Sequence, residues 1–210
     1  MILIITLETM IFITEGDSAG GALVQARDVQ TQAIFCLKGK PQNCFGYKRD
    51  IIYKNEELYN IMAALGIENG ISGLRYNKVI IATDSDVDGM HIRNLLTTYF
   101  VVFFDFIVRG GHLYVLETPL FRVRNKSQTI YCFSEQEKLL ALERIKNAEI
   151  TRFKGLGEIS PKEFSSFIGS DMRLFNIKFD NDYEKVIDFY MGKNTQERKQ
   201  FIIDNLIVDL

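Results

Sequence analysis

Residues 79–92 read VIIATDSDVDGMHI, and this stretch decides the fold. It opens with an apolar run that is typical of a buried strand. Three aspartates follow at alternate positions, Asp84, Asp86 and Asp88, and a helix-like segment comes after them. Two like charges about 4 Å apart repel by roughly 1 kcal/mol in water and by roughly 4 kcal/mol at an effective dielectric of 20. Three acids at the end of one strand therefore point to a bound cation.

Short apolar runs alternate with helix-like stretches on both sides of this segment, which is typical of a parallel sheet covered by helices. We expect residues 10–120 to form one α/β domain with a Rossmann-like parallel sheet, after a short lead-in over residues 1–10. The predicted strands are 10–14, 33–37, 79–83 and 112–118, and the predicted helices are 17–29, 55–65 and 89–108.

The pattern changes after Pro119. Residues 121–134 alternate like a hairpin, an amphipathic helix follows over 135–147, and a loop is expected at 152–160. A last helix is predicted over 194–206, with Asn194 or Thr195 as its cap. We expect residues 121–210 to form a mixed, mainly helical C-terminal segment, although no linker marks the boundary.

The composition excludes several classes of protein. The chain is 47% hydrophobic and 25% charged, which is ordinary for a folded domain. Three separated cysteines and two histidines argue against a disulfide framework or a zinc site and favour a reduced, cytoplasmic setting. The apolar runs at 1–16 and 99–108 are each interrupted by an acid and fall short of the roughly 18–20 residues that a membrane span needs. We expect a soluble protein with no membrane partner.

The net charge of −2 is no argument against a nucleic-acid partner. Residues 171–210 hold eight acidic and six basic residues, so they account for the whole −2 and residues 1–170 are neutral. Without the acidic cluster, that larger part of the chain is basic.

The carboxylates favour Mg²⁺ over Ca²⁺. The run D-x-D-x-D-G opens an EF-hand loop, but the twelfth position counted from Asp84 is Leu95, where that loop needs an acid. Glu15 ends the first predicted strand, so it joins the aspartates at the carboxyl edge of the sheet if the two strands are neighbours. Alternate residues of an extended segment share a face. Carboxylates without sulfur or imidazole suit Mg²⁺.

The alternative is that these acids are surface residues or helix caps. Asp17 or Ser18 is expected to cap the helix that follows Glu15. The regular placement of three aspartates after a strand favours the metal site. For Glu15 taken alone, both interpretations stay open.

Four motifs occur in order along the chain: EGDSAGG (15–21), LKGK (37–40), ATDSDVDGMHI (82–92) and RFKGLGE (152–158). Together they resemble the B subunits of bacterial type IIA DNA topoisomerases, the family of DNA gyrase and topoisomerase IV. The first and third motifs alone would indicate only a TOPRIM domain, which primases, type IA topoisomerases and some nucleases also contain. The similarity continues to the C-terminus through FYMGKNTQERKQFIIDNL (189–206).

The resemblance implies roles for single residues. Glu15 matches a glutamate that acts as general acid/base and Mg²⁺ ligand in DNA strand cleavage and religation. Asp84, Asp86 and Asp88 match the other Mg²⁺ ligands, for which Mn²⁺ can substitute. His91 matches a family histidine to which we assign no role.

Further positions match residues beside the DNA. Asp17 and Lys38 fall where quinolone-type inhibitors are sensed in the family. The positions expected to face DNA are Lys38, Lys40, Arg152, Lys154, Gly155 and Gly157.

The resemblance also implies partners. The nucleophilic tyrosine of the family belongs to an A subunit, and the parent A₂B₂ enzyme acts on double-stranded DNA with ATP, in the cytoplasm and at the nucleoid. The family's ATPase region precedes the TOPRIM domain. This chain starts about ten residues before the TOPRIM motif and shows no nucleotide-binding loop there. We therefore expect no ATP site and no activity of this chain alone.

Two other functions stay open: a stand-alone Mg²⁺-dependent TOPRIM nuclease, and a catalytically silent segment that docks on the A subunit. A nuclease has no reason to share the MGKNTQERKQF stretch, residues 191–201, which disfavours it. Whether the parent enzyme supercoils or decatenates DNA is not fixed by these residues.

Overall fold

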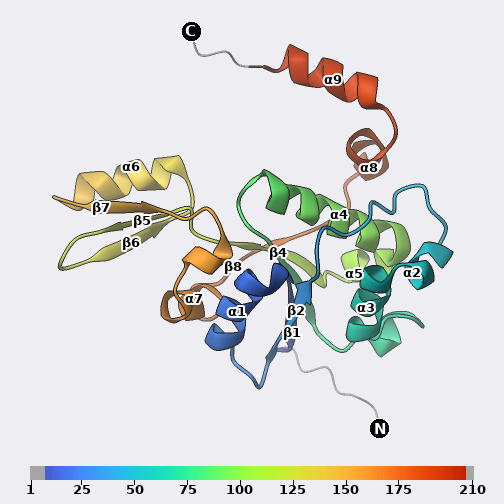
Figure 1. Ribbon diagram of the computed structural model, residues 1–210, viewed down its shortest axis with the longest axis horizontal. Coiled ribbons are helices and arrows are strands. Elements are labelled where there is room, and N and C mark those ends of the chain that lie inside the picture. Colours follow the sequence, from blue (N-terminus) through green and yellow to red (C-terminus); the bar gives the residue numbers. More distant parts are fainter. Residues whose placement is uncertain (1–7, 207–210) are drawn as a thin grey trace.

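A five-stranded sheet organises the computed structural model, which describes residues 8–206 (Figure 1). Most of the predicted lead-in therefore lies outside the described residues. The strand order is β2-β1-β3-β4-β8, with the first four strands parallel and β8 antiparallel to β4. The predicted α/β fold with a parallel sheet is confirmed. The strands are β1 (Met10–Glu15), β2 (Gln32–Leu37), β3 (Lys78–Ala82), β4 (Leu113–Glu117) and β8 (Arg173–Asn176).

Helices cover both faces of this sheet, because alternate side chains of each buried strand point to opposite sides. Ile11 and Ile81 pack in a core with the helices α2 to α5, whereas Phe12 and Ile80 pack with α1 and α7 on the other face. The helices are α1 (Gly16–Ala26), α2 (Asp50–Lys54), α3 (Glu56–Leu65), α4 (Val87–Phe103), α5 (Asp105–Arg109) and α7 (Pro161–Phe167), and a short 3₁₀ turn, η1, spans Ile71–Gly73.

The single helix predicted over 89–108 is wrong, since the chain breaks at Phe104 between α4 and α5. Phe104 has φ −139° and ψ 47°, and its side chain is fully buried against Tyr99, with ring centroids 5.2 Å apart. A straight helix of that length would run about 30 Å. The five-residue strands beneath it span only about 17 Å, so the break keeps the chain on the sheet.

A second, smaller sheet stands beside the first (Figure 1). The predicted hairpin is confirmed as two antiparallel strands, and its turn closes where the Asn125 N–H donates to the Gln128 carbonyl at 2.9 Å. A third strand, which the sequence did not indicate, pairs with the other side of the hairpin's first strand. The elements are β5 (Phe121–Arg124), β6 (Thr129–Cys132) and β7 (Glu149–Arg152), with α6 (Glu135–Arg144) packed on one face.

The chain beyond residue 120 returns to the first sheet. β8 pairs with β4, and α7 packs in the same core as α1. The domain boundary near residue 120 stays a prediction. Beyond it, β8 completes the first sheet and α7 covers part of one face. The last two helices, α8 (Tyr183–Met191) and α9 (Thr195–Asp204), project from the body and bury none of their residues (Figure 1). Asn194 precedes α9, but its side-chain oxygen accepts from Arg198 and does not cap the helix.

Glu163 joins the small sheet to α7. Its Oε1 accepts from the Arg122 guanidinium at 2.6 Å and from the Tyr131 hydroxyl at 2.7 Å, and its Oε2 accepts from the Ser160 hydroxyl at 2.6 Å. Burial by itself raises the pKa of Glu163, but these hydrogen bonds outweigh burial and lower it to about 2.

Glu163→Gln is expected to change the acid stability of the protein. Because the folded-state pKa of about 2 lies below the ordinary 4.5, the ion pair stabilises the fold fully above pH 4.5 and loses this effect as the pH falls toward 2. Urea unfolding is expected to show a loss of about 1.5–3 kcal/mol at neutral pH. The stability curve of the variant is expected to be flatter below pH 4.5. An acid-unfolding curve identical to wild type would contradict this role.

Candidate functional site

The strand order brings the predicted carboxylates to one edge of the sheet. β1 and β3 are neighbours, with Thr14 opposite Ala82, so both strands end at the same level. Glu15 is the last residue of β1, and Asp84 lies two residues beyond the end of β3. The condition on which the metal prediction depended, adjacent strands, is therefore met.

The three aspartates do not lie on one extended segment, so that expectation is wrong. α4 begins at Val87, Asp86 occupies its N-cap, and Asp88 lies in its first turn. The Asp86 Oδ1 accepts the Gly89 N–H at 2.8 Å. A helix start leaves N–H groups free and favours negative charge, which explains why the helix begins inside the acidic run.

Asp84 is held by a distant loop of the chain. Its Oδ1 accepts the backbone N–H of Leu156 at 2.7 Å, across 72 residues of sequence. Burial raises the pKa of Asp84, the bond from Leu156 opposes this rise, and the charges of Asp86 and Glu158 add to it. The RFKGLGE motif and the aspartate motif thus meet at one carboxylate.

Glu15 is the least satisfied acid of the site. It is half-buried, and its Oε2 has no hydrogen-bond partner among the described residues. Burial raises the pKa of Glu15, and the charges of Asp84, Asp86 and Asp88 raise it further, in that order. An orphaned carboxylate oxygen amid like charges creates a demand for a cation.

The donor set fits a hard divalent cation. Four carboxylates without sulfur or imidazole are the ligands that Mg²⁺ accepts, and Mg²⁺ keeps several of its waters. Within residues 8–206, no group of three or more His, Cys, Asp or Glu side chains is arranged so that it could hold a metal ion. The residues that would hold the ion are Glu15, Asp84, Asp86 and Asp88.

Lys40 reaches this cluster, whereas Lys38 does not. The Lys40 ammonium lies 2.5 Å from the Asp88 Oδ1, and this hydrogen bond lowers the pKa of Asp88. Lys38 pairs with Glu56 of α3 at 3.2 Å. The two lysines of the LKGK motif therefore have different surroundings, and Lys40 supplies positive charge to the carboxylates.

Lys40→Met is expected to tighten the binding of Mn²⁺ to this site about 2- to 5-fold, since the lysine and the cation compete for Asp88. Isothermal titration with Mn²⁺, with Mg²⁺ as competitor, measures this affinity. Lys54→Met removes an ion pair of the same kind with Asp50, away from the site, and is expected to leave the affinity unchanged. Equal or weaker binding by the Lys40 variant would rule out the competition.

The start of α1 differs from the prediction. The helix begins at Gly16, so Asp17 and Ser18 lie inside its first turn and neither caps it. Glu15 occupies the N-cap position, and its side chain makes no capping bond, which leaves its carboxylate available to the site. Asp17 is exposed.

The loop over residues 153–159 lies against the carboxylates through its backbone. Phe153, Leu156 and Ile159 are buried in the core of α1 and α7, whereas Lys154 is exposed. This regular spacing of apolar residues was the signal in the sequence that the loop is anchored, and the prediction missed it. The backbone N–H of Leu156 could not be identified from the sequence, because any residue type except proline carries one.

Three other predicted positions are placed as follows. Arg152 is exposed, with its guanidinium 5.8 Å from the ring centre of Phe121. Gly157 faces α1, where an added Cβ would lie 2.9 Å from the Ser18 hydroxyl. His91 is exposed.

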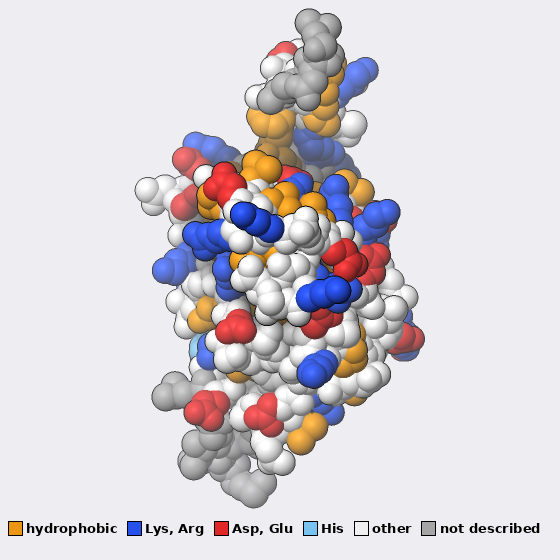
Figure 2. Space-filling model, turned by 90° about the vertical axis from the view of Figure 1, so that its left-hand side faces the viewer, with side chains coloured by type: hydrophobic (Ala, Val, Ile, Leu, Met, Phe, Trp, Pro, Cys, Tyr) orange, Lys and Arg blue, Asp and Glu red, His pale blue; other side chains and the backbone are white. Residues whose placement is uncertain are grey.

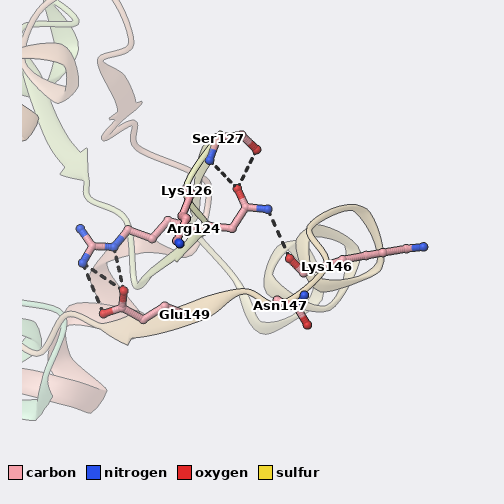
Figure 3. A pocket seen from close by; sticks show the side chains of 7 residues that line it. Arg124, Lys126, Ser127, Lys146, Asn147 and Glu149 are labelled. Atoms are coloured by element: carbon pink, nitrogen blue, oxygen red, sulfur yellow. Dashed lines mark hydrogen bonds and ion pairs between the residues drawn. The ribbon is translucent and has the colours of Figure 1, made fainter.

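A hollow of about 660 Å³ lies elsewhere, at the tip of the small sheet (Figure 3). Arg124 pairs there with Glu149 at 3.1 Å, and the Asn125 amide donates to the Lys146 carbonyl at 3.2 Å. Figure 2 views the molecule from this side and shows Lys and Arg side chains interspersed with acidic ones. None of Glu15, Asp84, Asp86 and Asp88 lines this hollow. The candidate site is therefore identified by the positions of these acids, not by the volume of this hollow.

Comparison with known protein families gives two matches along the chain. The family model of the Toprim domain matches residues 10–118, and that of the DNA gyrase B subunit, carboxyl terminus, matches residues 145–203. In the part of the chain that the structure describes, no helix is both long and apolar enough to cross a membrane.

Relatives share nearly the full length of the chain. The B subunit of DNA topoisomerase 4 from Borreliella burgdorferi is 59% identical over 207 residues, which are 95% of this chain and 34% of that protein. The B subunit of DNA gyrase from Spiroplasma citri is 38% identical over 93% of this chain and 32% of its own length. The chain thus spans about a third of these curated relatives.

A solved structure shows the same fold. The crystal structure of the Plasmodium falciparum topoisomerase II DNA-binding, cleavage and re-ligation domain superimposes with a TM-score of 0.80 and 28% identity. The match covers 97% of this chain and 30% of that one.

Proposed function

The chain belongs to the Toprim family and to the B subunits of type II DNA topoisomerases, and from this premise we propose that it forms the Mg²⁺-binding part of a DNA cleavage and religation site. The observation that carries this proposal is the orphaned, half-buried Glu15 carboxylate beside Asp84, Asp86 and Asp88. Relatives with this region are named as B subunits of topoisomerase IV and gyrase.

The bound ion, Glu15 and the aspartates would have different roles in the reaction. A bound Mg²⁺ would stabilise negative charge on the scissile phosphate and on the leaving oxygen. The pKa of Glu15 is raised by burial and by its acidic neighbours, and this residue suits a general acid/base role at the leaving oxygen. Asp84 and Asp86 each accept a backbone N–H with one carboxylate oxygen, which fixes their orientation.

DNA would be bound through its phosphates. Lys40 and Lys154 supply positive charge that is independent of base sequence. Gly155 and Gly157 let the backbone of the loop pack closely against Asp84 and against the Ser18 hydroxyl, which holds the loop at this edge of the sheet. Arg152, the last residue of β7, and Lys38, directly after β2, are both exposed. They would make further contacts to DNA phosphates.

The reaction needs a nucleophile from a partner. We assign this role to the tyrosine of an A subunit in an A₂B₂ enzyme that acts on cytoplasmic, nucleoid DNA and uses ATP through a region other than the one described here. Tyr99 of this chain is unsuited to it, since it is fully buried and donates to the Leu58 carbonyl. Exposed apolar residues on α9, such as Phe201 and Ile202, offer a surface for the partner.

Plasmid cleavage in Mg²⁺ tests the proposal, with the chain alone and with a cognate tyrosine-bearing subunit, stopped by detergent and protease. Linear DNA in the mixture only is the expected result. Nicks made by the chain alone, and lost in Glu15→Gln, would instead establish a nuclease. No cleavage in either reaction would leave a segment that only docks on its partner.

A further inference from the structure

The loop over residues 153–159 touches both the metal site and the expected path of DNA. The Leu156 N–H binds the Asp84 Oδ1 at 2.7 Å. Lys154, two residues earlier, is exposed and faces solvent. One short segment therefore carries a contact to a metal ligand and a positive charge suited to a phosphate.

We propose that this loop is a positioning element, which sets the orientation of the Asp84 carboxylate for cation binding. The inference rests on the proposed function and deepens it, because it gives the loop a part in the metal site and not only a contact to DNA.

The loop is built to hold one shape. Phe153, Leu156 and Ile159 are each 5% exposed or less and anchor it in the core that contains α1 and α7. The Glu158 carboxylate accepts the Lys154 N–H at 2.8 Å and closes the loop on itself. Because its apolar side chains are buried and a hydrogen bond closes its turn, the loop holds the Leu156 N–H in one direction.

Gly155 brings the loop against Asp84. A Cβ added at Gly155 would lie 2.7 Å from the Asp84 Oδ2 and 3.1 Å from its Cγ, inside van der Waals contact. Both oxygens of Asp84 are therefore in contact with the loop, one through a hydrogen bond and the other through close packing. A side chain at position 155 must displace the carboxylate or the loop.

This arrangement makes the affinity for the cation depend on the loop. Outer contacts that orient a metal ligand typically change metal affinity about 10- to 100-fold when they are removed. The effect of Gly155 on that affinity is measurable without DNA cleavage.

The test measures Mn²⁺ affinity by isothermal titration and by the electron paramagnetic resonance of bound Mn²⁺, on the full chain, with Mg²⁺ as competitor. Wild type is expected to bind Mn²⁺ that Mg²⁺ displaces. Gly155→Ala is expected to weaken this binding about 10-fold or more. Gly21→Ala on α1, where an added Cβ meets nothing within 4 Å, is the matched control and is expected to behave as wild type.

The outcomes separate the two proposals. If Gly155→Ala folds and binds Mn²⁺ as wild type does, the positioning role is overturned and the proposed function stands. If wild type binds no Mn²⁺ that Mg²⁺ displaces, both proposals fail together.

Discussion

Glu15→Gln is expected to lower DNA cleavage by the assembled enzyme by about 10²- to 10⁴-fold, the range for loss of a general acid/base. The amide keeps the shape of the side chain but neither exchanges a proton nor binds a cation with full charge. The fold is expected to persist, because the Glu15 Oε2 makes no hydrogen bond within the described residues and its neighbours are like charges. Asp84→Ala is expected to abolish cleavage in the same way.

The measurement is the yield of linear plasmid after detergent and protease, with thermal unfolding of each variant as the check on folding. Glu143→Gln on α6 removes an exposed acid away from the site and is the control. Normal cleavage by Glu15→Gln would contradict the assignment of Glu15 as the general acid/base.

Gly89→Ala is expected to destabilise the protein by about 2–5 kcal/mol, through overpacking and the loss of a helix cap. A Cβ at this position would lie 2.1 Å from the Asp84 carbonyl oxygen and within 2.8 Å of two more backbone atoms of Asp84. Backbone cannot move aside as a side-chain tip does, so the start of α4 must shift away from the end of β3. That shift breaks the bond from the Gly89 N–H to Asp86 and separates the aspartates.

Urea unfolding and Mn²⁺ titration measure the two effects of Gly89→Ala. The same substitution at Gly21, in the open interior of α1, is expected to change stability in the opposite direction by roughly 0.5–1 kcal/mol. A Gly89 variant as stable as wild type would show that the turn after β3 tolerates the extra methyl group.

Short-range patterns predicted much of this fold. The apolar runs at β1, β2, β3 and β4 were identified because buried parallel strands read as continuous hydrophobic segments. The helix predicted to end at residue 65 does so, and Gly66 follows it in the left-handed conformation with φ 72°. The meeting of Glu15 with the aspartates followed from the rule that ligands gather at the carboxyl ends of parallel strands.

Contacts between distant segments could not be predicted in this way. The bond from Leu156 to Asp84 joins residues 72 positions apart, and the Lys40–Asp88 pair joins residues 48 apart. No periodicity within a window of the chain contains such a pairing. The conformation of the acidic run was missed for a different reason: Asp86 is an N-cap, so helix geometry replaced the extended geometry that alternation implies.

The pairing of β8 with β4 imposes an order on the synthesis of the protein. β4 ends at Glu117, but the strand that covers its free edge begins at Arg173, so some fifty residues must leave the ribosome in between. During that interval β4 presents unpaired N–H and C=O groups, which are a template for pairing with other chains. The late arrival of β8 leaves this edge of the sheet open to pairing with other chains until β8 is in place.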